Sequence, residues 1–200
     1  MPELDSSLAG EWRFDPAHTR LGFSTRHAMV TKVRGAFNDV EGVINVDAEE
    51  PTNSTVAVTI KVASIDTRNE QRDQHLRTND FFDAPHHPEI TFVSKRIDQI
   101  EENSFIVNGD LTIRGVTREI AIPIEFIGVE RDPFGNLRAG FEGSRRIDRK
   151  DFGVNWNAAL DSGGVLVSDR ILLEFEVSAV KANGASPEGA DAEQKGEGQG

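Results

Sequence analysis

The sequence contains no cysteine, and this absence removes several kinds of site. Disulfide bonds, zinc sites built on thiolates and cysteine nucleophiles are all excluded. Long apolar runs are also missing, because no window approaches the roughly 18 consecutive apolar residues of a membrane-spanning helix. The chain has 200 residues, 37% of them hydrophobic and 28% charged, which is typical of one soluble domain with a sizeable core.

Positive charge is scarce. The chain has 22 Lys and Arg against 34 Asp and Glu, for a net charge of −12. Such a chain is poorly suited to neutralising the phosphates along a duplex, so we expect no nucleic-acid partner. The N-terminal stretch MPELDSSLAGEW has acids where a signal peptide has a basic region, and no basic amphipathic helix is present. We therefore expect a cytoplasmic protein without stable membrane insertion.

An alternation of apolar and polar residues dominates the chain from Glu11 to Lys181. This period of two indicates half-buried strands, and short turn-like linkers indicate that neighbouring strands are antiparallel. Eight antiparallel strands can close into a barrel without free edges, so the sequence predicts an all-β barrel. The expected strands are 20–27, 31–46, 54–65, 89–97, 104–114, 118–130, 137–147 and 167–180.

The two ends of the chain have a different composition. From residue 183 onward there is no Val, Ile, Leu or aromatic residue, so we expect an acidic, glycine-rich, disordered tail at 182–200. Residues 1–10 are expected to be a flexible N-terminus. The barrel domain is then predicted to span 11–181.

One polar stretch, TRNEQRDQHLRTNDFFDAPHHPE from Thr67 to Glu89, interrupts the strands. If the strands run up and down, the segments 66–88 and 148–168 belong to the same rim of the barrel. A possible N-cap at Thr67 and a pair from Asp73 to Arg77 predict a short helix. With Leu76 and the Phe81–Phe82 pair facing inward, the stretch would be a lid. The composition fits equally well a solvated crossover loop with two core phenylalanines.

Two polar side chains share apolar strand faces near that rim. His27 follows Phe23 and Thr25 on one face, and Arg145 follows Phe141 and Gly143 on another. We expect His27 and Arg145 to converge beneath the lid. The alternatives are a core histidine with satisfied hydrogen bonds and an arginine that reaches solvent from a strand end.

Motifs for catalysis are absent from the sequence. It has no GxSxG, P-loop, GxGxxG or HExxH pattern. A zinc site from His18, His27 and His75 has no ligand spacing behind it, and an acid–base pair of Asp73 and His75 has no accompanying nucleophile. We expect no enzymatic activity, no metal and no cofactor.

Five segments occur in an order and spacing that identify a family. They are GEWRFDPAHTRLGFSTRH, GAFNDVEGVI, SIDTRNEQRDQHLRTNDFFDAPHHPEITF, NGDLTIRGVTREI and IDRKDFGVNW. Together they resemble the YceI-like lipid- or polyisoprenoid-binding proteins over residues 11–181. The resemblance implies an extended eight-stranded antiparallel β-barrel, lipocalin-like in outline, with a short helix or loop lid at one end. It also implies a long apolar pore for an isoprenoid chain, and no catalysis.

The family's motifs map onto numbered positions of this chain. Its RD-HL and FFD elements fall within 72–76 and 81–83, its GDLTI-G-T element on 109–117, and its DR-DFG element on 148–153. Two departures are visible. Many relatives begin with a signal peptide that is not found here, and His87 stands where an aromatic residue often precedes the proline.

The resemblance and the residue pattern together predict that the chain binds, carries or sequesters an amphiphilic lipid. An isoprenoid quinone or a polyprenyl phosphate is the expected ligand. Glycines at 35, 109 and 143 on inward faces favour a cavity, although strand glycines also mark bulges. The alternatives are an enzyme at the barrel mouth and a packed barrel that binds a protein through its surface; a homodimer is left open. The predicted ligand-binding residues are Phe23, His27, Phe37, Arg72, His75, Leu76, Phe81, Phe82, Phe92, Leu111, Phe126, Phe141, Arg145, Phe152, Trp156 and Phe175.

Overall fold

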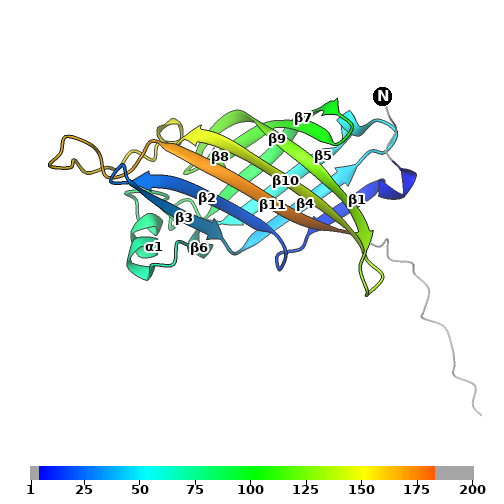
Figure 1. The fold of residues 1–200 in the computed structure, drawn as a ribbon, viewed down its shortest axis with the longest axis horizontal. Coiled ribbons are helices and arrows are strands. Elements are labelled where there is room, and N and C mark those ends of the chain that lie inside the picture. The colour runs from blue at the N-terminus through cyan, green and yellow to red at the C-terminus, as the bar shows by residue number, and fades with distance from the viewer. Residues whose placement is uncertain (1–4, 183–200) are drawn as a thin grey trace, which may run out of the picture.

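In the computed structural model, which describes residues 5–182, eleven strand segments form one antiparallel sheet that closes on itself (Figure 1). One α-helix, α1, spans Glu70–Arg77. Short 3-10 helices lie at Ser6–Leu8, Pro51–Asn53, Val62–Ser64 and Arg149–Phe152. The strands are β1 (Gly10–Phe14), β2 (Arg20–His27), β3 (Thr31–Phe37), β4 (Val40–Val46), β5 (Thr55–Lys61), β6 (Ile65–Asp66), β7 (Glu89–Glu101), β8 (Ser104–Ile113), β9 (Val116–Arg131), β10 (Leu137–Asp148) and β11 (Arg170–Lys181).

Three pairs of these segments are the halves of interrupted strands. β1 and β2 pair with opposite ends of β11, and β4 and β3 pair with β1 and β2 in turn. β5 pairs with β4 and β6 pairs with β3, so β5 and β6 are likewise the two halves of one strand. Counted in this way the barrel has eight long strands, and the β1–β11 pairing closes it. The predicted eight-stranded antiparallel barrel is confirmed.

Three details of the strand prediction were wrong. The predicted strand 54–65 is interrupted by the 3-10 helix Val62–Ser64, which separates β5 from β6. The predicted strand 31–46 is interrupted at Asn38 and Asp39, beside the turn that separates β1 from β2. β1 was not predicted at all, because five residues with one fully buried side chain, Trp12, give too short a periodic signal. The barrel closes through this strand.

Two clusters of apolar side chains fill the barrel. The cluster on the mouth side includes Phe92, Leu111 and Phe152, and the cluster at the far end is built on Trp12 and Ala179. The far-end cluster extends into the N-terminal segment, where the carbonyl of Leu8 accepts a hydrogen bond from Trp12 Nε1 at 2.8 Å. Residues 5–10 therefore include a 3-10 helix and the first residue of β1, while the expected flexibility of the N-terminus stays a prediction.

The inward-facing glycines do not open a cavity by themselves. A Cβ atom at Gly35 would collide with the Phe23 ring, and one at Gly109 would collide with Phe92. Gly143 is covered in the same way by Ile124 and the nearby backbone. The argument that glycines thin these faces was wrong, because neighbouring side chains pack over each of them.

Segments 66–88 and 148–168 lie at the same end of the barrel, as predicted, and this end is called the mouth below (Figure 1). The β8–β9 hairpin turns there through Arg114 and Gly115, whose φ values of 49° and 72° suit a two-residue turn. The predicted tail at 183–200 lies outside the described residues. Among the residues described, none of the helices has the length and apolar character needed to cross a bilayer.

Candidate functional site

The lid of the mouth is built around helix α1. The helix begins after Asn69, whose side chain accepts a hydrogen bond from Arg72 N at 2.9 Å. The short helix was predicted, but with Thr67 as its N-cap, which was wrong. Thr67 lies two residues before the cap and is buried.

Thr67 instead fastens the helix to the barrel wall. Its backbone N–H and its hydroxyl donate to Asp73 Oδ1 at 2.9 and 2.5 Å. Arg72 Nε and Nη2 donate to the hydroxyl and the carbonyl of Thr67 at 2.7 and 2.6 Å. The predicted pair of Asp73 with Arg77 is therefore absent; Arg77 reaches Glu70 instead, at 3.4 Å.

The second wall of the mouth, the loop after β10, is organised by Arg149. This buried side chain donates to the carbonyls of Val154 and Trp156 at 2.8 Å each, and to that of Ser168 at 3.0 Å. Burial lowers the pKa of the Arg149 guanidinium from its ordinary value. These hydrogen bonds from Arg149 fix the path of an irregular segment that lies outside the strands, and they place Trp156 at the mouth.

The lid and the loop meet through aromatic rings. The His75 ring lies 4.8 Å from the Trp156 ring and 5.1 Å from Phe81, both in edge-on geometry. Phe81 and Trp156 are 5.3 Å apart. Nε2 of His75 lies 2.8 Å from Oδ2 of Asp80, and this contact fixes the orientation of the imidazole.

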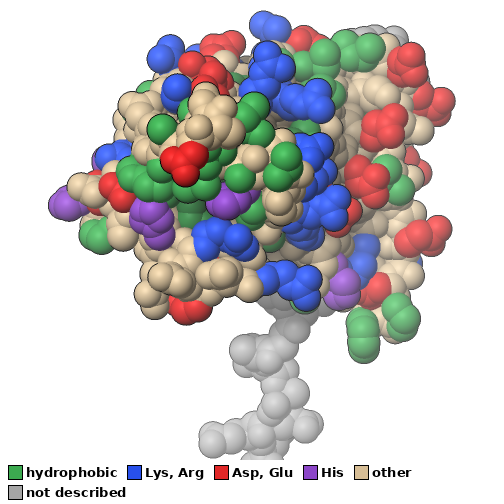
Figure 2. Space-filling model, turned by 60° about the vertical axis from the view of Figure 1, so that its left-hand side comes forward, with side chains coloured by type: hydrophobic (Ala, Val, Ile, Leu, Met, Phe, Trp, Pro, Cys, Tyr) green, Lys and Arg blue, Asp and Glu red, His purple; other side chains and the backbone are tan. Residues whose placement is uncertain are grey.

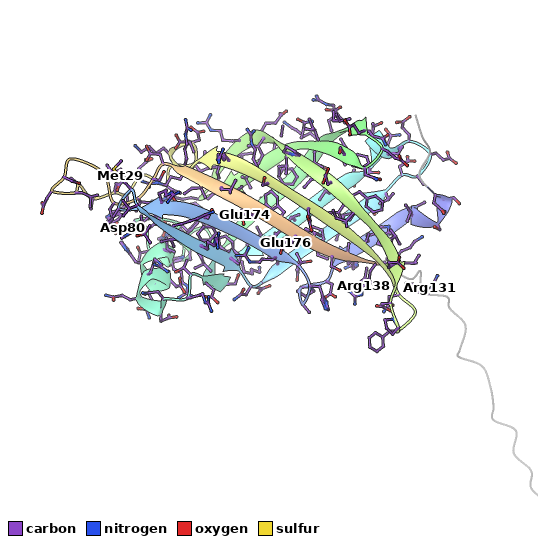
Figure 3. The ribbon with its side chains drawn as sticks, viewed as in Figure 1. Met29, Asp80, Arg131, Arg138, Glu174 and Glu176 are labelled. Carbon is purple, nitrogen blue, oxygen red and sulfur yellow. The ribbon has the colours of Figure 1, made fainter. Side chains whose placement is uncertain are left out.

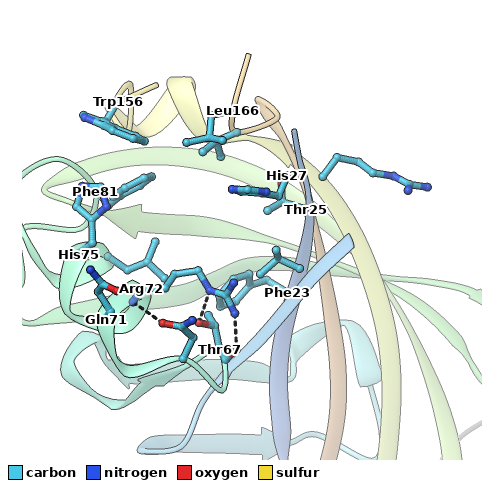
Figure 4. Close-up of a pocket in the computed structure, with 15 residues that line it drawn as sticks. Phe23, Thr25, His27, Thr67, Gln71, Arg72, His75, Phe81, Trp156 and Leu166 are labelled. Carbon is cyan, nitrogen blue, oxygen red and sulfur yellow. Dashed lines mark hydrogen bonds between the residues drawn. The ribbon is translucent and has the colours of Figure 1, made fainter. Parts of the chain in front are cut away.

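A hollow of about 440 Å³ opens between these walls and the β2–β3 hairpin (Figure 4). In Figure 4, Phe81 and Trp156 lie on one side of it and His27 and Phe23 on the other. We call this hollow the mouth pocket. Its lining residues are Phe23, Thr25, Arg26, His27, Val33, Thr67, Asn69, Gln71, Arg72, His75, Leu76, Phe81, Trp156, Leu166 and Val167.

The predicted ligand-binding residues are distributed along the barrel axis. Phe37 and Phe82 lie just behind the lining, since the Phe37 ring is 5.8 Å from Phe23 and 5.9 Å from Phe82. Those that line the mouth pocket are Phe23, His27, Arg72, His75, Leu76, Phe81 and Trp156. Those deeper in the mouth-side cluster are Phe92, Leu111, Phe152 and Phe175, and those in the far-end cluster are Phe126 and Phe141.

Arg145 does not join this set. The last β10 residue that pairs with β9 is Gly143, so Arg145 lies beyond the β9–β10 ladder, although it still pairs with Leu173 of β11, and its side chain is exposed. It is not part of the pocket lining, whereas His27 is. The expected convergence of His27 and Arg145 beneath the lid was wrong, because β10 separates from β9 before it reaches the mouth.

Several lining residues were not predicted. Thr25 and Val33 follow the strand parity that placed Phe23 inside, so this signal was available. Leu166 and Val167 belong to an irregular segment in which no period reveals a face. The backbone pairing of His27 with Val167 brings them to the pocket.

Apolar side chains below the mouth pocket are only partly buried. Phe175, Gly143, Ile124 and Phe105 occupy one row across β11, β10, β9 and β8, and residues in register share a face. Their side chains pack against the mouth-side cluster, yet Phe175, Ile124 and Phe105 are only half-buried. This row therefore presents partly accessible apolar surface next to the mouth-side cluster.

The residue sets considered above for a zinc site and for an acid–base pair are not brought together in the structure. His18 contacts Asp15 in the β1–β2 turn, at the opposite end of β2 from His27, so the zinc set of His18, His27 and His75 was wrong. No group of three potential metal ligands occurs among residues 5–182. The Asp73–His75 pair is also absent, because Asp73 accepts from Thr67 and His75 contacts Asp80.

An eight-stranded antiparallel barrel with a helix and a loop around an apolar mouth is the class of protein that these observations define. The sequence profile of the YceI-like domain matches residues 12–179. The chain is 39% identical over 170 residues to a UPF0312 protein of Staphylococcus epidermidis, covering 84% of this chain and 95% of the relative. The chain belongs to the YceI-like family.

Solved structures share the fold. A Campylobacter jejuni YceI protein superposes with a TM-score of 0.67 at 33% identity, over 79% of this chain and 90% of that chain. A polyisoprenoid-binding domain from Saccharophagus degradans superposes with a TM-score of 0.65 at 14% identity, over 87% of this chain and 99% of that one.

Proposed function

We propose that this protein binds an amphiphilic lipid with a polyisoprenoid chain, with the chain running from the mouth pocket into the barrel. The observation that carries the proposal is a pocket lined by Phe23, Leu76, Phe81, Trp156 and Leu166, with half-buried apolar side chains continuing along the barrel below it. Isoprenoid quinones and polyprenyl phosphates have the required long, thin apolar chain. The likeness to a polyisoprenoid-binding domain from Saccharophagus degradans supports the same ligand class.

The size of the pocket suits one end of such a ligand. Its volume of about 440 Å³ falls within the range of about 300–1,000 Å³ that is usual for small-molecule sites. Each CH₂ group that leaves water contributes about 0.8 kcal/mol. Ten buried carbons therefore contribute roughly 8 kcal/mol before association and ordering costs are subtracted. Affinity then comes chiefly from the apolar chain.

The head group would lie beside Arg26 and His27 at the pocket opening. Arg26 lines the pocket, its side chain is exposed, and its Nη1 donates weakly to Val30 O at 3.3 Å. The other guanidinium of the lining, on Arg72, already donates to Thr67. Because Arg26 alternates with Thr25 and His27 along β2, its side chain leaves from the outer face and would meet a phosphate at the rim of the opening.

We also propose that the protein carries or sequesters its ligand and does not transform it. Three of the charged or titratable groups of the lid, Arg72, Asp73 and His75, are held by Thr67 and Asp80. Groups with such local partners stiffen the lid. A chemical change in a bound isoprenoid recovered after incubation would instead support an enzyme at the mouth.

The first test concerns the apolar chain. Leu76→Asp places a carboxylate in the pocket, where it must be desolvated or protonated to admit an apolar chain, so we expect uptake of a neutral isoprenoid quinone to fall by at least tenfold. Phe134→Asp is the matched control, because Phe134 is 86% exposed in the β9–β10 turn at the far end. Titration of the quinone into both folded variants is the measurement. Equal affinities would place the ligand elsewhere.

The second test concerns the head group. Arg26→Gln is expected to weaken a polyprenyl phosphate by about ten- to hundredfold while leaving a quinone nearly unaffected, because a charge-assisted hydrogen bond contributes about 1.5–3 kcal/mol. Arg145→Gln removes an equal charge from an exposed residue outside the pocket lining. Titrations of both ligands into both variants separate the two effects. A similar loss of polyprenyl phosphate affinity in both variants would mean that the net charge of the protein, and not the position of Arg26, determines binding.

A further inference from the structure

Exposed aliphatic side chains form a tip beside the mouth pocket. Met29 and Val30, in the β2–β3 turn, are 65% and 76% exposed, and Val165, in the loop before β11, is 45% exposed. The two loops touch, since Met29 Sδ packs against Gly164 and Ala28 N donates to Leu166 O at 2.8 Å. We call Met29, Val30 and Val165 the apolar tip.

The apolar tip is held in a fixed shape. Asn157 Nδ2 donates to Val167 O at 2.8 Å, and Asn157 Oδ1 accepts from Val167 N at 3.0 Å. Leu166 N donates to Ala158 O at 2.9 Å. These bonds organise the loop so that Leu166 and Val167 line the pocket while Val165 remains exposed. An exposed apolar surface maintained next to a binding site indicates a surface for interaction.

A band of basic side chains lies behind the apolar tip, on the outer face of the same strands. The register places Arg146 and Arg34 in one row, on either side of Leu172 and Ser24. The next row toward the mouth contains Arg170, which lies opposite Asp148, and the opposed pair Arg26 and Lys32. Figure 2 shows Lys and Arg side chains gathered in a band on this side of the molecule. We call Arg26, Lys32, Arg34, Arg146 and Arg170 the basic band; within residues 5–182, none of them forms an ion pair.

Acidic side chains occupy the same outer face farther from the mouth. Glu142 lies in register with Glu125 on one side and with Glu176 on the other, and the row ends at Arg20, opposite Glu176. Glu174 lies between that row and the basic band. In Figure 3, Met29 lies at one end of the barrel, Glu174 and Glu176 lie along its middle, and Arg131 and Arg138 lie at the other end. Charge therefore changes sign along β10 and β11 in a chain whose net charge is −12.

We propose that the mouth end is a docking surface for an anionic lipid bilayer, with the apolar tip in the head-group region and the basic band facing the lipid phosphates. A protein of net charge −12 is repelled by such a membrane unless its basic residues face it, so the basic band sets the orientation. The acidic rows then face the bulk solvent.

The chemistry of the surface distinguishes a bilayer from other anionic partners. The tip consists of protruding aliphatic side chains, with no aromatic residue on which a base could stack. The aliphatic side chains of the tip protrude beyond the Lys and Arg side chains of the band. When such a surface meets a bilayer, the aliphatic groups enter below the charged head groups and the Lys and Arg side chains stay level with the phosphates. The pocket opens beside the tip, so a docked molecule would present its mouth to the lipids. This surface is a separate feature from the proposed ligand, because docking needs no occupied pocket.

The test is flotation of the full chain with vesicles of phosphatidylcholine alone or mixed with phosphatidylglycerol. We expect binding to the mixed vesicles only, weakened by salt. Each Lys or Arg near an anionic surface changes partitioning by about fivefold, so Arg34→Glu with Arg146→Glu should lower binding by at least tenfold. The matched control is Arg13→Glu with Arg131→Glu, which changes the net charge equally at the far end. Retained binding by Arg34→Lys with Arg146→Lys confirms that charge is responsible.

The tip has its own matched pair. Met29→Gln with Val165→Gln should lower flotation severalfold, whereas Phe134→Gln, at an equally exposed apolar residue of the far end, should leave it unchanged. Absence of native binding to phosphatidylglycerol vesicles would overturn the proposal, as would equal loss in the two charge-reversed pairs. Tighter binding to double-stranded DNA than to vesicles would assign the band to nucleic acid instead. Quinone uptake from detergent solution should be unchanged in the Arg34→Glu, Arg146→Glu variant, so failure of docking and failure of lipid binding are separate results.

Discussion

The side chain of Asp15 joins the turn between β1 and β2, which interrupts the barrel wall, to the β9–β10 turn at the far end. Its Oδ2 accepts from Arg138 Nη1 at 2.5 Å, and Arg138 Nε in turn donates to Asp132 at 2.9 Å. The hydrogen bond from Arg138, helped by His18, lowers the pKa of Asp15 from 3.8 to about 2. The Asp15 side chain is 15% exposed, so little of this interaction is screened by water.

The lowered pKa of Asp15 predicts how stability depends on pH. A carboxyl group whose pKa is lower in the folded state stabilises the fold above its unfolded pKa, and this contribution disappears as the pH falls from about 4 to about 2. The shift corresponds to about 2 kcal/mol, so Asp15→Asn should be less stable at neutral pH by about that amount. Urea unfolding of both proteins at several pH values should show the difference closing near pH 2. A difference that stays constant with pH would mean that the ion pair contributes nothing, and Glu176→Gln, an exposed acid in the acidic row, is the control.

At the scale of elements, α1 is too short to be stable alone. It has eight residues, and isolated helices shorter than about 12–15 residues are marginal in water. Its stability comes from the Asn69 cap, from the bonds of Arg72 and Asp73 to Thr67, and from Leu76, which packs on the mouth-side cluster. The stability of the lid therefore depends on the hydrogen bonds that Arg72 and Asp73 make to Thr67.

Thr67→Val is expected to loosen the lid without unfolding the barrel. The substitution keeps the size of the side chain but leaves the buried Asp73 without its hydroxyl donor, at a cost of about 1–3 kcal/mol. Hydrogen exchange should quicken for the amides of α1 and stay unchanged in β7 to β10. Thr112→Val is the control, because Thr112 is on β8 and its hydroxyl bonds to Thr117. Equal effects of both variants on α1 would show that Thr67 does not hold the lid.

At the scale of the whole molecule, the barrel depends on one short closure. β1 pairs with β11 through Trp12, Arg13 and Phe14, opposite 179–181, and Ala182 N donates to Glu11 O at 2.8 Å. The buried Ala179 lies in the far-end cluster. Residues 179–182 are therefore essential to closure although they are the last ones described.

Two truncations test this dependence. A chain ending at residue 182 should unfold at nearly the same temperature as the full chain, because residues 183–200 contain no Val, Ile, Leu or aromatic side chain. A chain ending at 178 loses the β1–β11 pairs and should unfold at least several degrees lower, at about 2–4 °C per kcal/mol lost. Thermal unfolding followed by circular dichroism is the measurement. A large drop for the longer chain would show that residues 183–200 contribute to the fold.

Strand periodicity was sufficient for much of the architecture. The period of two located the segments that make up β2 to β5 and β7 to β11, and strand parity alone placed 66–88 and 148–168 at one mouth. Parity also put Phe23 and His27 on the inner face. These features follow from a local rule, namely that successive strand residues point to opposite sides, and a local rule can be read from the order of residues.

The remaining features depend on contacts between residues far apart in the chain. The helix is capped by Asn69 and not by Thr67, because Thr67 is buried against Asp73. Arg145 lies outside the mouth pocket because β10 separates from β9 after Gly143. The basic band has no counterpart in the linear sequence, since Arg34 and Arg146 become neighbours in one row only through the register of β3, β2, β11 and β10. The sequence by itself determined the strands, their parity and the family, because those follow from local pattern. Only the tertiary structure decided the pocket lining, the fastening of the lid and the charged surface, because register and burial are set by all the strands together.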